Sequence, residues 1–324
     1  MRAVRFHEFG PPEVLRVEEL PEPAAGPDEV LVRVEAAGVN FADTVRRRGE
    51  FYPAPTVLPC TTGGEIVGTV EAVGEGGNQA LVGTRVVARC EGACAELVAT
   101  PAQAVFPFPD GMDPVDGVAL FVQGLTAALI LREAAPLRGG ETVFVEGAAG
   151  GVGSLAVQLA KLGGAGLVIG GARGEERQAL ARGFGADHAV DYRGPGWTER
   201  VRELTGGRGV DLYLNMAGAE IFDQCLDTLA WRGRVVVFGS ASGTPPRLEV
   251  ARLFAKCQSV TAFLLFGYLA DRELITGTLD ALADLARSGE LTVHVGGRFS
   301  FEQVADAHRE LESGRSVGKL VVVP

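Results

Sequence analysis

The sequence predicts an α/β fold in which a doubly wound parallel sheet is joined to a barrel-like β domain. A glycine-rich turn at 147–153 connects a short apolar strand to a helix-forming run, and beyond residue 123 further apolar strands alternate with helical segments. This alternation is typical of a parallel sheet covered by helices on both faces. Before residue 123, short strands are separated by Pro and Gly clusters instead, which favours a compact barrel.

The N-terminal region shows the alternation of apolar and polar residues that half-buried strands require. We expect strands over 30–36, 65–73 and 84–88, and an amphipathic helix over 271–288. The final run KLVVV, residues 319–323, is expected to rejoin the sheet of this first domain. The predicted domains are therefore 1–122 with 267–324, and an inserted dinucleotide-binding domain over 123–266.

Within the inserted domain, strands and helices are expected to alternate. The predicted strands are 143–146, 167–172, 188–191, 210–215, 234–239 and 260–266, and the predicted helices are 151–163, 175–184, 198–205 and 219–230.

The segment ETVFVEGAAGGVG, residues 141–153, carries the main chemical signal. Its spacing is G-x-x-G-x-x-G, a variant of the commoner G-x-G-x-x-G, and it lies between a strand and a helix as a dinucleotide site requires. Glycines let the backbone turn tightly beside a pyrophosphate, and the helix N-terminus supplies N–H groups and partial positive charge. The segment therefore predicts a Rossmann-type cofactor site.

The second strand of that domain favours NADPH over NADH. NAD-binding proteins place a carboxylate about twenty residues beyond the glycine turn, but here that strand ends in Gly-Gly-Ala-Arg. Arg173 and Arg177 can offer guanidinium donors to a 2′-phosphate, and Tyr192 could flank the adenine or bond the phosphate. The alternatives are that Arg177 is a solvated helix charge and that the following acids, 175–176, bind a ribose hydroxyl.

Composition narrows the class of protein. The net charge of −11 argues against a general nucleic-acid or anionic-membrane binder, because phosphate neutralisation needs clustered Lys and Arg. We identify no signal peptide and no apolar run of the ~18 residues that a membrane helix needs, so we expect a soluble, cytoplasmic protein. The five cysteines are expected to be free thiols, and no Cys/His spacing predicts a metal site.

Five stretches in order, AAGVNFADTVRRRGEF, GGEIVGTVEAVG, GLTAALIL, GAAGGVG and GADHAVDYR, resemble the zinc-independent quinone oxidoreductases. This is the zeta-crystallin-like branch of the medium-chain dehydrogenase/reductase superfamily, and the resemblance covers essentially the whole chain. It implies a GroES-like catalytic domain, a Rossmann domain and NADPH-dependent reduction of quinones, with some relatives acting on enones or enoyl thioesters.

The same resemblance implies that zinc is absent. Zinc alcohol dehydrogenases of the superfamily carry Cys where this chain has Asn40 and His where it has Gly64, and their cysteine-rich lobe has no counterpart between Cys90 and Val105. Without two of its ligands a tetrahedral zinc is not held. The acceptor must then already be electrophilic, as quinones and α,β-unsaturated carbonyls are.

Residue by residue, the resemblance implies two groups of site residues. Asn40, Phe41 and Asp43 would lie beside the nicotinamide, and Tyr52 is a candidate for the substrate pocket. Contacts with the cofactor are implied for Thr126, in the turn before the Rossmann unit, for the glycine turn, and for several strand-end and C-terminal residues. The turn and these later residues are Gly150, Gly151, Val152, Gly153, Asn215, Gly239, Ser240, Phe263, Leu265, Arg315 and Lys319.

Structural roles are alternatives for several of these residues. Asn40 could cap a helix, Asp43 could be a first-turn acid, Asn215 could bind strand-end backbone groups, Tyr52 could pack a loop, and 263–265 could be sheet core. No Ser/His/Asp or paired-carboxylate arrangement stands out, so no catalytic acid is assigned.

Three functions remain open: an NADPH:quinone reductase, an enoyl-type reductase, and a binding or structural protein that keeps the NADPH fold. The apolar strand 260–266 is expected to form the edge of a homodimer, as the resemblance suggests.

Overall fold

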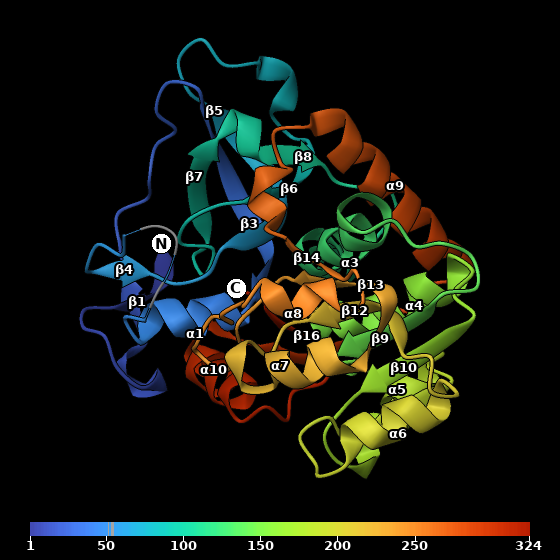
Figure 1. Cartoon of the computed structure of the whole chain (residues 1–324). Coiled ribbons are helices and arrows are strands. Elements are labelled where there is room, and N and C mark those ends of the chain that lie inside the picture. Colours follow the sequence, from blue (N-terminus) through green and yellow to red (C-terminus); the bar gives the residue numbers. More distant parts are fainter. Residues whose placement is uncertain (51, 53–54) are drawn as a thin grey trace. The chain divides into compact units, whose positions relative to one another are not determined.

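The computed structural model describes residues 1–50, 52 and 55–324 (Figure 1). These residues form two compact units. Unit 1 comprises Met1–Val122, Leu269–Ser288 and Val293–Pro324, and unit 2 comprises Gln123–Tyr268 with Gly289–Thr292. The sequence placed its two domain boundaries after residues 122 and 266.

Unit 1 is built on two sheets. In the larger sheet the order is β15-β16-β3-β5-β6-β8, with β7 also paired to β3, and the smaller sheet has the order β2-β1-β4. The strands are β1 (Arg2–Phe6), β2 (Arg16–Glu19), β3 (Glu29–Val39), β4 (Cys60–Thr61), β5 (Glu65–Val73), β6 (Arg85–Arg89), β7 (Leu97–Pro101), β8 (Val105–Pro107), β15 (Val295–Phe299) and β16 (Lys319–Val322). The C-terminal strand β16 pairs antiparallel with β3, which confirms that the chain returns to this sheet.

Helices of unit 1 are short except for one. They are α1 (Phe41–Arg47), α2 (Pro114–Ala119), α9 (Arg272–Ser288) and α10 (Val304–Glu312), with 3-10 turns η1 (Pro12–Val14), η2 (Gln79–Leu81), η3 (Ala102–Ala104) and η7 (Phe301–Gln303). Helix α9 lies one residue inside the predicted amphipathic helix 271–288.

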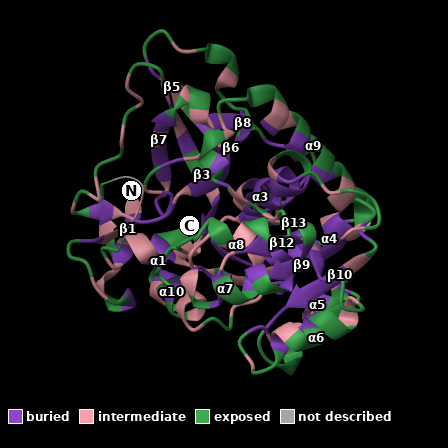
Figure 2. Cartoon of the chain, viewed as in Figure 1, coloured by how far each residue is buried: buried purple, intermediate pink, exposed green. Residues whose placement is uncertain are grey.

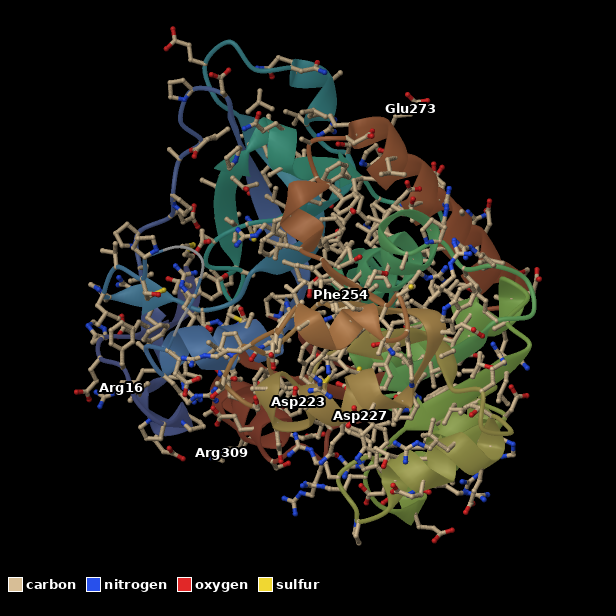
Figure 3. The ribbon with its side chains drawn as sticks, viewed as in Figure 1. Arg16, Asp223, Asp227, Phe254, Glu273 and Arg309 are labelled. Carbon is tan, nitrogen blue, oxygen red and sulfur yellow. The ribbon has the colours of Figure 1, made fainter. Side chains whose placement is uncertain are left out.

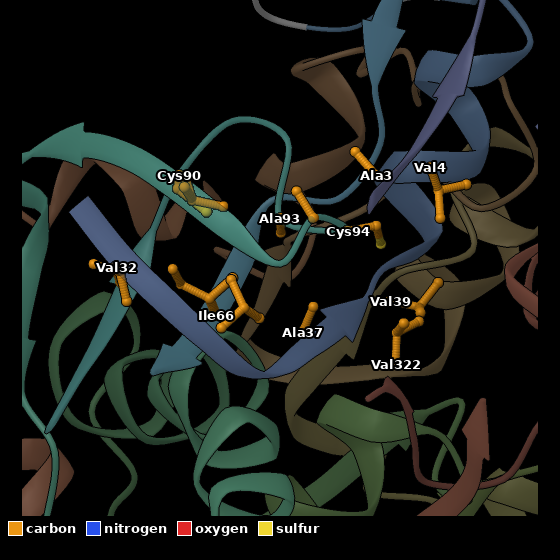
Figure 4. Close-up of a cluster of buried hydrophobic side chains, with 14 of the residues drawn as sticks. Ala3, Val4, Val32, Ala37, Val39, Ile66, Cys90, Ala93, Cys94 and Val322 are labelled. Carbon is orange, nitrogen blue, oxygen red and sulfur yellow. The ribbon is translucent and has the colours of Figure 1, made fainter. Parts of the chain in front are cut away.

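Small and β-branched side chains fill the core of unit 1. Ala37 of β3, Ile66 of β5 and Val322 of β16 belong to one buried cluster with Cys90 and Cys94 (Figure 4). Both cysteines are free thiols in this apolar cluster, and burial raises their pKa well above the ordinary thiol value. They therefore pack as small hydrophobic residues.

Unit 2 is a parallel sheet with the strand order β11-β10-β9-β12-β13-β14. In chain order this is 3-2-1-4-5-6, the arrangement of dinucleotide-binding Rossmann folds. Its strands are β9 (Thr142–Glu146), β10 (Leu167–Gly171), β11 (His188–Val190), β12 (Val210–Asn215), β13 (Leu229–Val237) and β14 (Ser259–Ala262). Strands β9 and β10 are almost wholly buried (Figure 2), as continuous apolar runs predict.

Helix α3 (Leu125–Leu129) precedes the first strand of unit 2, and the other helices of this unit follow its strands. These are α4 (Gly151–Leu162), α5 (Glu175–Gly183), α6 (Trp197–Leu204), α7 (Ala219–Thr228) and α8 (Ala251–Phe254). The π-helical turn η4 (Leu120–Gly124) begins in unit 1 and ends in unit 2, and the turns η5 (π-helical, Ile130–Ala134) and η6 (3-10, Leu265–Gly267) lie in unit 2. The alternation of strand and helix predicted from the sequence is confirmed.

Three sequence predictions need correction here. The strand expected over 260–266 ends at Ala262, and 265–267 form a 3-10 turn, because an apolar run alone does not specify strand geometry. Thr126 lies inside helix α3 and not in a turn. The continuous helical stretch Pro114–Ala134 is long and apolar enough to cross a membrane, contrary to expectation, but 83% of its most apolar window is buried inside the protein.

A close approach of backbone to backbone fixes the glycine-rich turn. The first glycine, Gly147, adopts φ +60°, and a Cβ added to Gly153 would lie 2.1 Å from the carbonyl oxygen of Gly147. Helix α4 can therefore follow β9 this closely only if residue 153 has no side chain.

We predict that Gly153→Ala destabilises the protein by about 1–3 kcal/mol or more, since the Cβ would displace backbone. Gly277→Ala is the matched control, because Gly277 is an exposed glycine inside α9 with nothing within 4 Å of an added Cβ. That control should stabilise the protein by about 0.5–1 kcal/mol. Urea unfolding measures both, and equal effects would contradict the close approach.

Candidate functional site

In unit 1, α1 begins where β3 ends, and Asn40 joins the two. The Asn40 backbone N–H donates to Asp43 Oδ2 at 2.8 Å, as in a capping box. Both structural alternatives for these residues are therefore realised, since Asn40 is the N-cap and Asp43 a first-turn acid. The cap also holds the two side chains at one end of α1.

The Asn40 side chain is clamped by a buried ion pair. Its Nδ2 donates to Glu65 Oε1 at 2.8 Å, and its Oδ1 accepts from Lys319 Nζ at 3.0 Å. Lys319 Nζ lies 2.5 Å from Glu65 Oε1, and both charged side chains are at most 2% exposed. The backbone N–H of Val122 donates to the second Glu65 oxygen at 3.1 Å. The structure thus brings together Asn40, Asp43 and Lys319, which lie far apart in the sequence.

Asp43 is buried beside this network. Burial raises the pKa of its carboxyl to about 6, against the opposing effects of the Asn40 N–H and the Lys319 charge. A Cβ added to Gly64 would lie 3.8 Å from Asp43 Oδ1, so the small residue at 64 borders this carboxyl. A buried carboxyl that titrates near neutrality can hold or release a proton.

Other predicted residues of unit 1 lie at its surface or edge. Tyr52 is half-buried and its hydroxyl lies 3.4 Å from Arg89 Nη2, while residues 51, 53 and 54 beside it lie outside the described residues. The Phe41 ring faces the guanidinium of Arg48, 5.7 Å from its centroid. Arg315 is exposed and bonds Ser313, and it is not part of the Asn40 network.

In unit 2, the predicted phosphate cradle lies at the start of α4. Gly150 is the N-cap, and Gly151, Val152 and Gly153 form the first turn of this 12-residue helix. First-turn N–H groups of a helix have no intrahelical acceptor and carry partial positive charge. The turn therefore fits a dinucleotide pyrophosphate, as its sequence indicated.

A buried carboxylate, Glu146, anchors the next strand end beside this turn. It accepts from Asn215 Nδ2 at 2.7 Å and from the backbone N–H groups of Met216 and Ala217 at 2.8 Å each. Burial raises the pKa of Glu146, and these donors oppose that shift. Asn215 thus ends β12 as predicted, with its side chain bound to Glu146.

Of the residues predicted to lie near the 2′-phosphate, Arg173 is exposed, Arg177 is half-buried and Tyr192 is buried. Arg173 is exposed after β10, and Arg177 Nε donates to its carbonyl oxygen at 2.8 Å, so the two guanidinium groups belong to one local turn. Tyr192 is only 7% exposed and belongs to the core cluster of unit 2. A Cβ on Gly171 would meet Tyr192 and Phe144 at 2.8 Å, so packing also requires a glycine at that strand end.

The remaining predicted cofactor residues lie at helix or strand ends. Thr126 is 7% exposed, and Gly239 and Ser240 follow β13. Phe263 and Leu265 are buried just after β14, where Phe263 stacks on Tyr268 at 5.2 Å between ring centroids.

Sequence reasoning missed the two acids that organise these regions, Glu65 and Glu146. Glu146 ends the buried strand β9 and Glu65 precedes the buried residues 66–68 of β5, and this contrast between a charged residue and its buried neighbours was the available signal. Across 1–50, 52 and 55–324 there is no group of three or more His, Cys, Asp or Glu side chains that could hold a metal ion.

Comparison with known families identifies both parts of the chain. Residues 26–110 match the alcohol dehydrogenase GroES-like domain, and residues 151–284 match the zinc-binding dehydrogenase domain. A quinone oxidoreductase of Pseudomonas aeruginosa is 37% identical, covering 100% of this chain and 99% of its own. A 2-haloacrylate reductase of a Burkholderia species is 32% identical, covering 99% and 98%.

Solved structures show the same similarity to quinone oxidoreductases. A mycobacterial protein in complex with NADPH has a TM-score of 0.93 at 38% identity, and the match covers 100% of both chains. The Escherichia coli quinone oxidoreductase in complex with NADPH has a TM-score of 0.94 at 32% identity, again over 100% of both chains.

The raised pKa of Asp43 predicts that the free energy of unfolding depends on pH. A carboxyl whose folded pKa exceeds its unfolded value stabilises the fold fully below the unfolded value, and this contribution is lost as the pH rises through the folded one. Between pH about 4 and 7, wild type should therefore lose up to about 3 kcal/mol relative to Asp43→Asn, whose amide oxygen still accepts from Asn40. Urea unfolding across this range measures the difference.

Asp284→Asn serves as the control, because Asp284 is an exposed carboxylate on α9. Its difference from wild type should stay nearly constant over the same pH range. If the difference in unfolding free energy between wild type and Asp43→Asn also stayed constant with pH, the assigned effect of burial on the pKa of Asp43 would be contradicted.

Proposed function

Because the chain belongs to the quinone oxidoreductase branch of the medium-chain dehydrogenase/reductase superfamily, we propose that it reduces quinones with NADPH. The single observation that carries the proposal is the turn from β9 through Gly147–Gly153 into α4, at the first crossover of a 3-2-1-4-5-6 sheet. NADPH-bound relatives with the same fold over their full length support the same cofactor.

The residues of the turn fit the cofactor by their shape. Gly153 leaves α4 in contact with the backbone of Gly147, and the first-turn N–H groups at 151–153 would bond the pyrophosphate. Arg173 and Arg177 would bind the 2′-phosphate. When bound, NADPH supplies a hydride to an acceptor that is already electrophilic.

The acceptor region would be formed by the capped end of α1. Asn40, locked by Glu65 and Lys319, and Asp43 would present fixed polar groups, which favours orientation of an acceptor without reorganisation during the reaction. We assign no dedicated catalytic acid, and solvent can protonate the product.

Zinc-independent chemistry is part of the proposal. A metal bound at Asn40 would face the ammonium group of Lys319, 3.0 Å from the Asn40 oxygen. Two cations beside one oxygen atom repel strongly in a buried site. The Asn40 side chain is therefore better suited to hydrogen bonding than to metal ligation.

A second candidate is reduction of an activated alkene, such as an enone or enoyl thioester, which is favoured by the 2-haloacrylate reductase among the relatives. A third, which the resemblance leaves open, is NADPH binding without turnover. We further propose that the enzyme is cytoplasmic, with a small-molecule substrate and no nucleic-acid or membrane partner.

We also propose a homodimer formed through the edge of the unit 2 sheet. Strand β14 is an edge strand, and Leu264 beyond it is 55% exposed, while Phe254 of α8, labelled in Figure 3, is 74% exposed. Exposed apolar residues near an edge strand favour pairing. Light scattering at micromolar concentration should give a dimer, and Leu264→Lys should weaken it; a monomeric wild type would contradict the proposal.

Stopped-flow measurement of NADPH oxidation tests the function directly. The acceptors are 9,10-phenanthrenequinone and crotonyl-CoA. Prompt oxidation by the quinone supports the proposal, whereas oxidation only by the thioester supports the alkene reductase. Binding of NADPH without oxidation by either acceptor would identify a non-catalytic protein.

The 2′-phosphate assignment is tested with Arg173→Ala/Arg177→Ala. Charge-assisted hydrogen bonds contribute about 1.5–3 kcal/mol each, so the Kd for NADPH should rise at least ~10-fold while that for NADH changes little. Fluorescence titration measures both. Arg182→Ala, an exposed arginine on the same helix, should alter neither, and an equal loss for both nucleotides would refute the assignment.

A further inference from the structure

Tyr52 in unit 1 lies between two guanidinium groups. The Arg46 guanidinium carbon lies 5.0 Å from the centroid of the Tyr52 ring, and Arg89 Nη2 donates to the Tyr52 hydroxyl at 3.4 Å. Arg46 projects from α1 and Arg89 from the end of β6. The two arginines thus come from different elements but meet at one tyrosine.

One exposed carboxylate, Glu91, bridges both arginines. Arg46 Nη1 and Arg89 Nη1 both pair with it, the second at 3.3 Å. The arginine side chains are only 12% and 21% exposed, whereas that of Glu91 is 53% exposed. The two guanidinium groups are therefore largely buried, and the carboxylate that they share is exposed to solvent.

The cluster adjoins the proposed acceptor residues. Arg46 follows Asp43 by three residues, one turn along α1, and Asp43 interacts electrostatically with both Arg46 and Tyr52. Among the described residues, Glu91 pairs with both arginines and Asp43 interacts electrostatically with Arg46, while Arg46 Nε also donates to Thr56 at 3.3 Å. Glu91 is the more readily displaced of the two acids because Asp43 is buried.

We propose that Arg46, Arg89 and Tyr52 form a subsite for the carboxylate of an α,β-unsaturated acid, and that Glu91 occupies this subsite when no acid is bound. This inference rests on the second candidate of the proposed function, the reduction of an activated alkene, and names the class of alkene. Two guanidinium groups suit a carboxylate, which accepts two parallel hydrogen bonds.

Pairing would also assist the reaction. A free carboxylate makes its conjugated alkene a poor hydride acceptor, and two adjacent cations offset that charge. In the reaction the hydride forms a C–H bond at the β-carbon, the C=C π electrons move to the α-carbon, and a proton from solvent completes the second C–H bond. The alkene is reduced and NADPH becomes NADP⁺.

The test compares 2-chloroacrylate with its methyl ester, which keeps the alkene and removes the charge. The readout is the ratio of kcat/KM for the acid to that for the ester. We expect Arg89→Gln to lower this ratio at least ~10-fold, because it removes a charge-assisted contact. Glu91→Gln should raise the ratio by about 3-fold or more, since it removes a competing carboxylate.

Arg85→Gln is the matched control, because Arg85 lies on the same strand and pairs with Glu35 at the surface. It should leave the acid-to-ester ratio unchanged. Unchanged ratios in Arg89→Gln and Glu91→Gln, or reduction of the ester but not the acid by wild type, would overturn the subsite while leaving the reductase proposal intact.

Failure of every acceptor, including phenanthrenequinone, would overturn the proposed function itself. In that case, saturation-transfer NMR tests whether the subsite binds 2-chloropropionate, a saturated acid that keeps the carboxylate and has no alkene to reduce. The expected result is a stronger signal in Glu91→Gln than in wild type and loss of the signal in Arg89→Gln, and equal signals in all three proteins would overturn the inference.

Discussion

The buried ion pair between Lys319 and Glu65 is the constraint on which the organisation of unit 1 depends. Lys319 opens the C-terminal strand β16, and Glu65 opens β5, which lies across β3 from it. Burying two charges costs several kcal/mol unless each is paired and hydrogen-bonded. Asn40 and the Val122 N–H supply the additional bonds, so the end of β3, the start of α1 and the C-terminal strand are held together.

Unit 2 uses a carboxylate in a comparable way. Glu146 closes β9 and binds the backbone where β12 ends, so that two neighbouring strand ends are tied together directly before the glycine turn. The ligand-binding edge of a Rossmann sheet is made from such strand ends. In both units, therefore, a buried acid ties together elements that carry candidate site residues.

The charges around Tyr52 are more exposed to solvent than those around Asn40. The Asn40 network is closed, with every charged member buried, whereas Arg46 and Arg89 share one solvated carboxylate. A closed network supports geometry, and an exchangeable counter-ion allows ligand binding. An enzyme that relies on an electrophilic acceptor can gain selectivity by this route, because the charge of the acceptor then contributes to recognition.

The sequence alone determined the α/β class, the glycine-rich turn and most strands, because glycine spacing and hydrophobic periodicity are local properties. It also indicated the return of the chain in 319–323 to the first sheet. Only the tertiary structure decided that Lys319, Glu65 and Asn40 meet, that Tyr192 and Gly171 pack together, that Thr126 is helical and that the strand near 260 ends early. These features depend on which distant residues share a buried space, and no local pattern encodes that.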